Sequence, residues 1–287
     1  MTTPGGAAAT AELVTERFPT AVGEVQLTRG GAPSPSSPLV YLHSSGGETG
    51  SGEVAELLGL LAAEREVFAP MLPGFAGSEG LEQIDDIEDA AYHTIDVLDR
   101  LGLDGERAPH LVGLSLGGWL AAEIAWRHPE RVRSLTLVNA VGLYVPGHPM
   151  SELFGRPFDE LARNVFTDQS FPAAAAMHAL AAVGPKDMAS VPFELVRPFY
   201  EAMAAAAKLG WNPYFHNPKL PRRLARVSAP TLVIVGRKDG LVPNAVGEEY
   251  ARLIPGARLE YVDDGSHMLT LEHPQAVMHL LRAHLAG

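Results

Sequence analysis

Short apolar runs alternate with segments of helical periodicity along most of this chain. The runs LVYL, LVGL, LTLV and TLVIV are apolar at successive positions, not at every second one. This pattern is typical of strands that are buried on both faces of a parallel sheet. Strands are therefore expected at 24–28, 39–43, 66–69, 110–114, 134–139, 231–235 and 258–262.

Helical segments are expected between these strands. They cover 51–64, 87–101, 116–127, 244–254 and 274–285. A strand, a helix and a parallel strand in succession form a right-handed unit, and repeated units build an open sheet. The expected fold class is therefore α/β, with a mostly parallel sheet and helices on both of its faces.

The alternation stops between residues 139 and 222. This stretch is rich in Ala, Leu, Met and Phe, and several prolines divide it into short helical pieces. A helical insertion in an α/β sheet is most simply a cap over a site at the carboxyl ends of the strands. We expect a core of 1–140 and 223–287 with a cap of 141–222, while 1–12 is expected to be a tail.

Composition excludes several classes of function. The chain has 22 Lys and Arg against 34 Asp and Glu, and its net charge of −12 disfavours binding to nucleic acid. It has no cysteine, which excludes disulfides, thiolate metal sites and a cysteine nucleophile. The eleven histidines have no metal-ligand spacing, so no metal is expected, and no other cofactor is implied.

No membrane-targeting segment is expected. The N-terminal residues lack early positive charge, since the first basic residue is Arg17, and they contain no long apolar run. The Ala-rich stretch at 173–183 is too short to span a bilayer and contains His178. We therefore expect a soluble, cytoplasmic protein, either a monomer or a homodimer.

The strongest motif is Gly113-Leu114-Ser115-Leu116-Gly117, a G-x-S-x-G pattern between an expected strand and an expected helix. A serine at such a turn has a strained backbone, and glycines at the outer positions avoid clashes with the neighbouring strand and helix. The turn exposes the hydroxyl and directs the N-terminus of the helix toward it. We therefore expect Ser115 to be a nucleophile, with a chance glycine turn as the alternative.

A serine hydroxyl is a weak nucleophile near neutral pH and needs a base. His267 follows the expected strand 258–262 through a Gly-Ser loop. Four other histidines fall on expected helices or their ends, namely His128, His273, His279 and His284. His110 lies inside the strand before Ser115, away from the strand's end. We expect His267 to be the base and the rate to fall as the imidazole is protonated in acid.

The base in turn needs an orienting carboxylate. Asp239 follows the most apolar expected strand, and the order Ser115, Asp239, His267 is the one that α/β-hydrolases use. A rival position follows the preceding strand, where this chain has Asn139, and an amide cannot supply the charge. Asp263 and Asp264 stay as alternatives because they are close to His267 in the sequence.

The negatively charged oxygen of a tetrahedral intermediate needs hydrogen-bond donors. One expected donor is the backbone N–H of Leu116, directly after the nucleophile at the helix N-terminus. The other is the backbone N–H of Ser45, in the small-residue loop that follows the strand LVYL. A plain turn is the alternative for this loop, and His43 is expected to hold it in place.

Together these motifs resemble those of the α/β-hydrolase superfamily over roughly residues 20–287. The segments that carry the resemblance are 43–47, 72–78, 113–118, 236–243 and 265–267. The resemblance implies the α/β-hydrolase fold with a helical cap inserted after the sixth strand, and serine hydrolase activity. Three positions depart from the family pattern: Ser44 and Ala76 stand where glycine is common, and Met71 stands where aspartate is common.

The expected function is hydrolysis of a carboxylic ester of a small to medium apolar substrate through an acyl-enzyme, a carboxylesterase-like activity. Apolar side chains of the expected cap favour an apolar substrate pocket. Candidate substrate contacts are Trp119, Leu143, Trp211 and Met268.

Other functions fit the same motifs. Carbon–carbon bond hydrolases of ring-fission diketones keep the Ser-Asp-His order, although they often have an aromatic residue where this chain has Met268. Cofactor-free perhydrolases share the triad. A non-catalytic receptor for a small molecule could use the same fold. Epoxide hydrolases and haloalkane dehalogenases have a carboxylate where Ser115 stands, which argues against both.

Overall fold

A computed structural model describes residues 11–33, 36–47, 50–183, 187 and 191–286, and these residues form one eight-stranded sheet. The strand order is β1-β2-β4-β3-β5-β6-β7-β8. The strands are β1 Leu13–Pro19, β2 Glu24–Gly30, β3 Leu39–Leu42, β4 Val67–Pro70, β5 His110–Leu114, β6 Ser134–Val138, β7 Thr231–Gly236 and β8 Arg258–Val262. Only the β1–β2 and β2–β4 pairs are antiparallel, so the expected fold class is confirmed.

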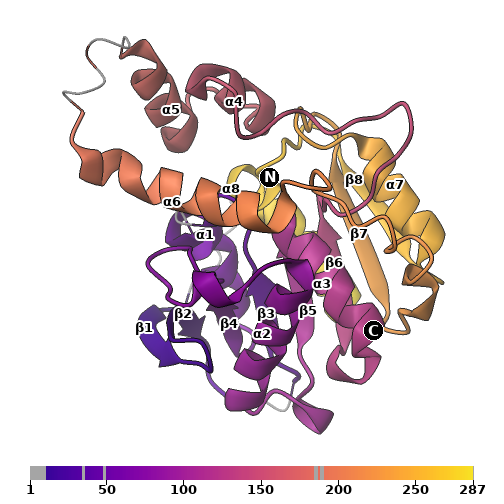
Figure 1. Ribbon diagram of the computed structural model, residues 1–287. Coiled ribbons are helices and arrows are strands. Elements are labelled where there is room, and N and C mark those ends of the chain that lie inside the picture. Colours follow the sequence, from indigo (N-terminus) through magenta and orange to yellow (C-terminus); the bar gives the residue numbers. More distant parts are fainter. Residues whose placement is uncertain (1–10, 34–35, 48–49, 184–186, 188–190, 287) are drawn as a thin grey trace, which may run out of the picture.

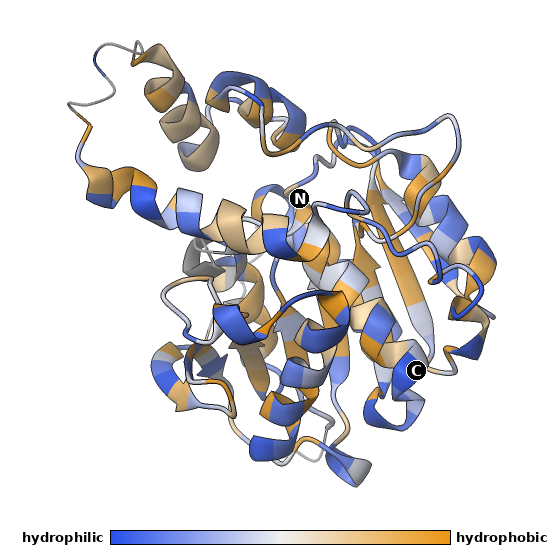
Figure 2. Cartoon of the chain, viewed as in Figure 1, coloured by the Kyte–Doolittle hydropathy of each residue, from blue (hydrophilic) through white to orange (hydrophobic). Residues whose placement is uncertain are grey.

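The central strands are buried because helices cover both faces of the sheet. Every residue of β3, β5, β6 and β7 is buried, which explains their continuous apolar sequences. Figure 2 shows most of β7 as hydrophobic, whereas α2 alternates between hydrophobic and hydrophilic residues. The core helices are α1 Gly50–Ala62, α2 Ile87–Arg100, α3 Leu116–Arg127, α7 Asn244–Leu253, α8 Leu269–Glu272 and α9 Pro274–Leu285.

Helices α2 and α3 contact each other in front of the sheet in Figure 1, whereas α1 contacts α8 and α9. Three further helices follow β6 and precede β7. They are α4 Phe158–Val165, α5 Pro172–Ala182 and α6 Phe193–Gly210. They lie above the carboxyl ends of the central strands in Figure 1. The expected helical insertion at this point of the chain is confirmed.

Strand β1 was not expected from the sequence. Its residues are exposed or half-buried, and it pairs with β2 alone at the edge of the sheet. An edge strand of this kind lacks the continuous apolar run that identifies the central strands. Of the expected tail, 1–10 lie outside the described residues, and the N–H of Ala11 donates to the carbonyl of Gly59 at 3.0 Å.

Candidate active site

Ser115 occupies a sharp turn between β5 and α3. Its backbone has φ 54° and ψ −113°, a conformation that is costly for a residue with a side chain. The N–H of Ser115 donates to the carbonyl of Val138 at 2.9 Å, which fixes the turn against β6. The residue is only 1% exposed. This is the strained strand-to-helix turn that positions a serine at the carboxyl edge of a sheet.

The two outer glycines of the motif are required by close backbone contacts. A Cβ atom at Gly113 would lie 2.2 Å from the carbonyl oxygen of Gly117. A Cβ atom at Gly117 would lie 2.0 Å from the carbonyl oxygen of Leu42 and 2.6 Å from that of His43. The first turn of α3 therefore contacts the backbone at the end of β3, where the loop 43–47 begins.

Asp239 and His267 come together at the ends of β7 and β8. The Nδ1 atom of His267 lies 2.8 Å from Oδ2 of Asp239, and the two side chains are 3% and 1% exposed. A carboxylate only accepts hydrogen bonds, so Nδ1 carries the proton and Nε2 is left as an acceptor. The pair therefore has the arrangement of a general base oriented by a carboxylate.

The second oxygen of Asp239 fixes the carboxylate in its own loop. Oδ1 accepts from the N–H groups of Leu241 at 2.8 Å and Val242 at 2.9 Å. The two alternative carboxylates point elsewhere, because Asp263 pairs with Arg237 and Asp264 pairs with Lys238 on the surface. The carboxylate that the structure places beside the imidazole is that of Asp239.

Ser115 and His267 lie at the same edge of the sheet, after β5 and β8. Among the described residues, no hydrogen bond joins the Ser115 hydroxyl to another group. Such bonds often form only when substrate is bound.

Asn139 holds the loops of Asp239 and His267 together. It follows β6, with φ 44°, and its Nδ2 donates to the carbonyls of Ser266 at 2.8 Å and His267 at 2.9 Å. Its Oδ1 accepts from the N–H of Gly236 at 2.8 Å. All of these bonds need an amide, which donates and accepts on one side chain. From the sequence, Asn139 is expected only to be unable to supply the charge of the acid, and this positioning role was not predicted.

The loop after β3 presents a free backbone donor. Within the described part of the chain, the N–H of Ser45 donates to no acceptor, whereas that of Gly46 donates to Oγ of Ser44 at 3.1 Å. The N–H of Leu116 lies in the first turn of α3, where a helix offers no acceptor. Both N–H groups that sequence analysis selected are therefore available to a negatively charged oxygen.

His43 links this loop to the chain after β4. Its Nδ1 donates to the carbonyl of Ser44 at 2.7 Å, and its Nε2 accepts from the N–H of Leu72 at 3.0 Å. Burial lowers the pKa of His43, against the opposing effect of nearby Glu53, so the neutral ring is favoured. His43 therefore holds the loop in place.

A cavity of about 220 Å³ lies between the core and the helices α4 to α6. Its core wall includes Ser45, His267 and Met268, but not Ser115. Within the described residues, the wall contains no Asp, Glu, Lys or Arg. The segment between β6 and β7, which holds these helices, contributes Leu153, Phe158, Leu161, Val165, Phe166, Ala173, Ala176, Met177, Leu180, Phe199, Ala202 and Met203. The cavity suits an apolar group beside the imidazole.

Only one of the four candidate substrate contacts lines this cavity, namely Met268. Leu143 lines a second cavity, and Trp211 is 62% exposed beside the ring of Phe154. Residues missed by sequence analysis include Phe158, Leu161 and Val165, whose spacing on α4 marks one helical face.

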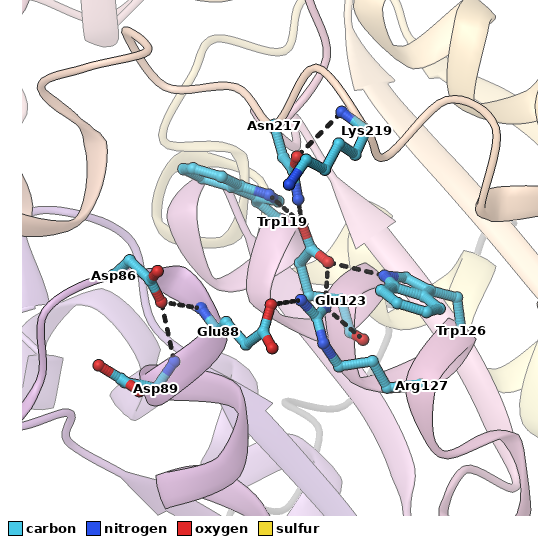
Figure 3. Close-up of polar contacts among 9 residues, drawn as sticks. All are labelled: Asp86, Glu88, Asp89, Trp119, Glu123, Trp126, Arg127, Asn217 and Lys219. Atoms are coloured by element: carbon cyan, nitrogen blue, oxygen red, sulfur yellow. Dashed lines mark hydrogen bonds and ion pairs between the residues drawn. The ribbon is translucent and has the colours of Figure 1, made fainter.

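Trp119 belongs to a buried polar network on the outer side of α3 (Figure 3). Its Nε1 donates to Glu123 at 3.0 Å, and Glu123 also accepts from Trp126 at 2.7 Å and Asn217 at 2.7 Å. Arg127 pairs with both Glu123 and Glu88. The network ties the chain after α6 to α3, so the structure gives Trp119 a packing role.

Two properties of the described residues bear on other functions. The described residues contain no cluster of three or more His, Asp or Glu side chains that could hold a metal ion. None of their helices combines the length and apolar character needed to cross a membrane.

Comparison with known proteins places this geometry in a family. A family model described as alpha/beta hydrolase fold matches residues 37–274. The chain is 29% identical to a 2-hydroxymuconate semialdehyde hydrolase of Pseudomonas putida, with 87% of each chain covered. It is 27% identical to a pimeloyl-[acyl-carrier protein] methyl ester esterase of Neisseria meningitidis, covering 81% of this chain and 88% of that protein.

A solved structure and a larger protein are also similar. The structure is a 2-hydroxy-6-oxo-6-phenylhexa-2,4-dienoate hydrolase of Rhodococcus, with a TM-score of 0.77 and 25% identity over 97% of this chain and 100% of that one. The chain is also 31% identical, over 95% of its length, to a polyketide synthase of Burkholderia thailandensis, of which it spans only 12%.

Proposed function

The chain belongs to the α/β-hydrolase fold family, and within that family we propose that it is a serine hydrolase of uncharged, apolar carboxylic esters. The observation that carries this proposal is the uncharged cavity beside the paired side chains of His267 and Asp239. A charged substrate group would lose its hydration there without gaining a partner. A cavity of about 150 Å³ accommodates benzene. This cavity, of about 220 Å³, therefore suits a somewhat larger acyl group.

In the proposed reaction, Nε2 of His267 takes the proton of the Ser115 hydroxyl while the oxygen attacks the ester carbonyl. The carbonyl oxygen becomes negatively charged and accepts from the N–H groups of Ser45 and Leu116. The alcohol leaves with the proton from His267, and the acyl group stays on Ser115. Water, deprotonated by the same imidazole, then releases the acid. Asp239 stabilises the imidazolium in both steps.

Carbon–carbon bond hydrolysis is the second candidate. Two of the similar proteins are named as hydrolases of a ring-fission type of substrate, namely the 2-hydroxymuconate semialdehyde hydrolase and the 2-hydroxy-6-oxo-6-phenylhexa-2,4-dienoate hydrolase. A dienoate substrate carries a carboxylate. The described cavity wall has no cation to pair with one, which favours the ester.

A comparison of three substrates tests the proposal. We expect p-nitrophenyl butyrate to be hydrolysed with a kcat/KM at least 100-fold above that for the hemisuccinate ester, which carries a carboxylate at similar length. A ring-fission diketone acid should be slower than the butyrate. The Ser115→Ala variant controls for non-enzymatic hydrolysis. Faster consumption of the diketone would replace the ester proposal with the carbon–carbon one, and tight binding without turnover of any substrate would favour a receptor.

A further inference from the structure

Glu53 is a buried carboxylate that the proposed reaction does not use. It lies on α1, is 1% exposed, and faces the loop after β3. Oε1 accepts from the N–H of Ser44 at 2.9 Å and from the hydroxyl of Tyr41 at 3.0 Å, and Oε2 accepts from the hydroxyl of Ser44 at 2.5 Å. Among the described residues, no Lys or Arg pairs with it. A buried carboxylate is costly unless donors compensate it, and here three do so.

The contacts of Glu53 reach the other side of the site. The Tyr41 hydroxyl also lies 3.2 Å from Oγ1 of Thr270, which is three residues after His267. Tyr41 and Thr270 are 0% and 1% exposed. A continuous buried chain of hydrogen bonds therefore runs from the loop after β3 to the first turn of α8.

The hydrogen bonds of Ser44 determine the direction of the next N–H. Its N–H and hydroxyl are held by Glu53, and its carbonyl accepts from His43 at 2.7 Å and from the N–H of Gly47 at 3.1 Å. The Ser44 carbonyl and the Ser45 N–H belong to one planar trans peptide, so they point in opposite directions. Fixing the carbonyl toward His43 and Gly47 therefore fixes the free N–H of Ser45 away from them.

We propose that Glu53 is a positioning residue that holds the Ser44–Ser45 peptide with its N–H directed at the developing oxyanion. The inference rests on the proposed function. It also explains why serine replaces the expected glycine at position 44, because the Ser44 hydroxyl donates to Glu53 and accepts from Gly46, and glycine has no side chain to do either. Preorganised donors stabilise the transition state more than the bound substrate. Loss of Glu53 should thus lower kcat more than it raises KM.

Two variants weaken the hydrogen bonds between Glu53 and Ser44 in the loop after β3. Glu53→Gln keeps the shape but offers one acceptor oxygen in place of two, and Ser44→Ala removes only the hydroxyl. We expect Glu53→Gln to lower kcat for p-nitrophenyl butyrate by roughly 10- to 100-fold, with KM within about threefold, since loss of a whole oxyanion donor costs about 10²–10³. Ser44→Ala should give a smaller decrease in kcat.

A matched control distinguishes a role in positioning the oxyanion donor from a role in the stability of the fold. Glu123 is also a fully buried carboxylate with several donors, but it lies in the network on the outer side of α3. Glu123→Gln should lower the Tm while leaving kcat within about twofold. The affinity for an alkylboronic acid, whose tetrahedral serine adduct resembles the intermediate, should fall in Glu53→Gln by the same factor as kcat and stay unchanged in Glu123→Gln.

The outcomes distinguish the two proposals. If the wild type hydrolyses esters and Glu53→Gln keeps its kcat and boronate affinity within twofold, the role of Glu53 is wrong while the proposed function stands. If KM rises and kcat is unchanged, positioning of the oxyanion donor is also overturned. If the wild type neither hydrolyses esters nor binds the boronate, the proposed function fails and the role of Glu53 fails with it.

Discussion

Ser115, Asp239 and His267 each have a separate local constraint, on the backbone or on the side chain. Ser115 is strained at φ 54°, Asp239 accepts two N–H groups of its own loop, and the carbonyl of His267 accepts from Asn139. These constraints limit the freedom of each side chain before a substrate binds. Preorganisation of this kind is where a protein contributes most to acyl transfer.

Replacing Asp239 by asparagine should reduce kcat by roughly 10⁴-fold, because an amide neither stabilises the imidazolium nor selects the Nδ1–H tautomer. Asp263→Asn and Asp264→Asn are matched controls, since these carboxylates pair with surface cations. Both controls should retain activity within about twofold. Steady-state kinetics on the three variants checks this. A decrease in kcat of less than tenfold in Asp239→Asn would mean that another residue orients the imidazole.

A carboxylate added at position 139 should not restore the activity of the Asp239→Asn variant. The Nδ2 of Asn139 faces two carbonyl oxygens, and a carboxylate there would place oxygen against oxygen. We expect Asn139→Asp to lower the free energy of unfolding by about 2–3 kcal/mol through this lost pairing. Urea denaturation and the activity of the double variant measure both effects. Activity of the double variant tenfold above Asp239→Asn would show that position 139 can serve as the acid.

Two buried histidines should make stability depend on pH. Burial lowers the pKa of His93 and His110 from 6.5 to about 4 in the folded protein. Between these values the unfolded chain binds protons that the folded chain excludes, so stability is complete above about pH 6.5 and decreases as the pH falls toward 4. Each shift corresponds to about 3 kcal/mol at most.

Urea denaturation of the wild type and of His93→Leu between pH 7.5 and 4.5 tests this dependence. Nδ1 of His93 has no hydrogen-bond partner within the described chain, so leucine removes the titration without breaking a bond there. The wild type should lose more stability than the variant as the pH falls. If the free energy of unfolding falls equally with pH in the wild type and in His93→Leu, then His93 is protonated equally in the folded and unfolded states.

At the scale of elements, α3 approaches β3 so closely that only glycine fits between them. Gly117→Ala should destabilise the protein by about 3 kcal/mol or more, because the methyl group would meet the backbone oxygen of Leu42, which cannot rotate away. Gly102 is a matched control: its φ is +64° and a Cβ there meets nothing within 4 Å. Gly102→Ala should cost only about 1 kcal/mol, from backbone strain alone. If thermal denaturation shows that Gly117→Ala and Gly102→Ala destabilise the protein equally, the close approach of α3 to β3 is contradicted.

The inserted helices are tied to the loops of Asp239 and His267. The N–H of Met268 donates to the carbonyl of Val165 at 3.1 Å, and the N–H of Gly240 donates to that of Asn164 at 3.0 Å. The carboxylate of Glu272 accepts from the N–H groups of Thr167 and Asp168 and from the Ser266 hydroxyl. The end of α4 is therefore fixed to both loops, and the cavity wall has a defined position relative to the imidazole.

For the molecule as a whole, strand order explains how distant residues meet. Ser115, Asn139, Asp239 and His267 follow four adjacent parallel strands, β5, β6, β7 and β8. Ligand sites form at this edge in open α/β sheets because the loops converge there. The continuous apolar runs and the G-x-S-x-G turn predicted this fold, and the break in alternation after residue 139 predicted the helical insertion, because all three signals are local in the sequence.

Other features depend on contacts between distant segments and could not be predicted. Strand β1 is an edge strand without a buried apolar run, and the hydrogen bonds of Asn139 and Glu53 appear only when three or more segments are assembled. The same applies to the substrate contacts, because Trp119 and Trp211 are aromatic but do not line the cavity that Phe158 lines. Aromatic character alone does not determine which way a side chain faces.

The most direct test of the central claim is the mass of the protein after reaction with a fluorophosphonate, followed by mapping of the modified peptide. We expect one adduct on Ser115, none in Ser115→Ala, and labelling at least 100-fold slower in His267→Ala, because the hydroxyl then lacks its base. An adduct on another residue, or labelling of the wild type no faster than that of His267→Ala, would contradict the claim that Ser115 is a nucleophile activated by His267.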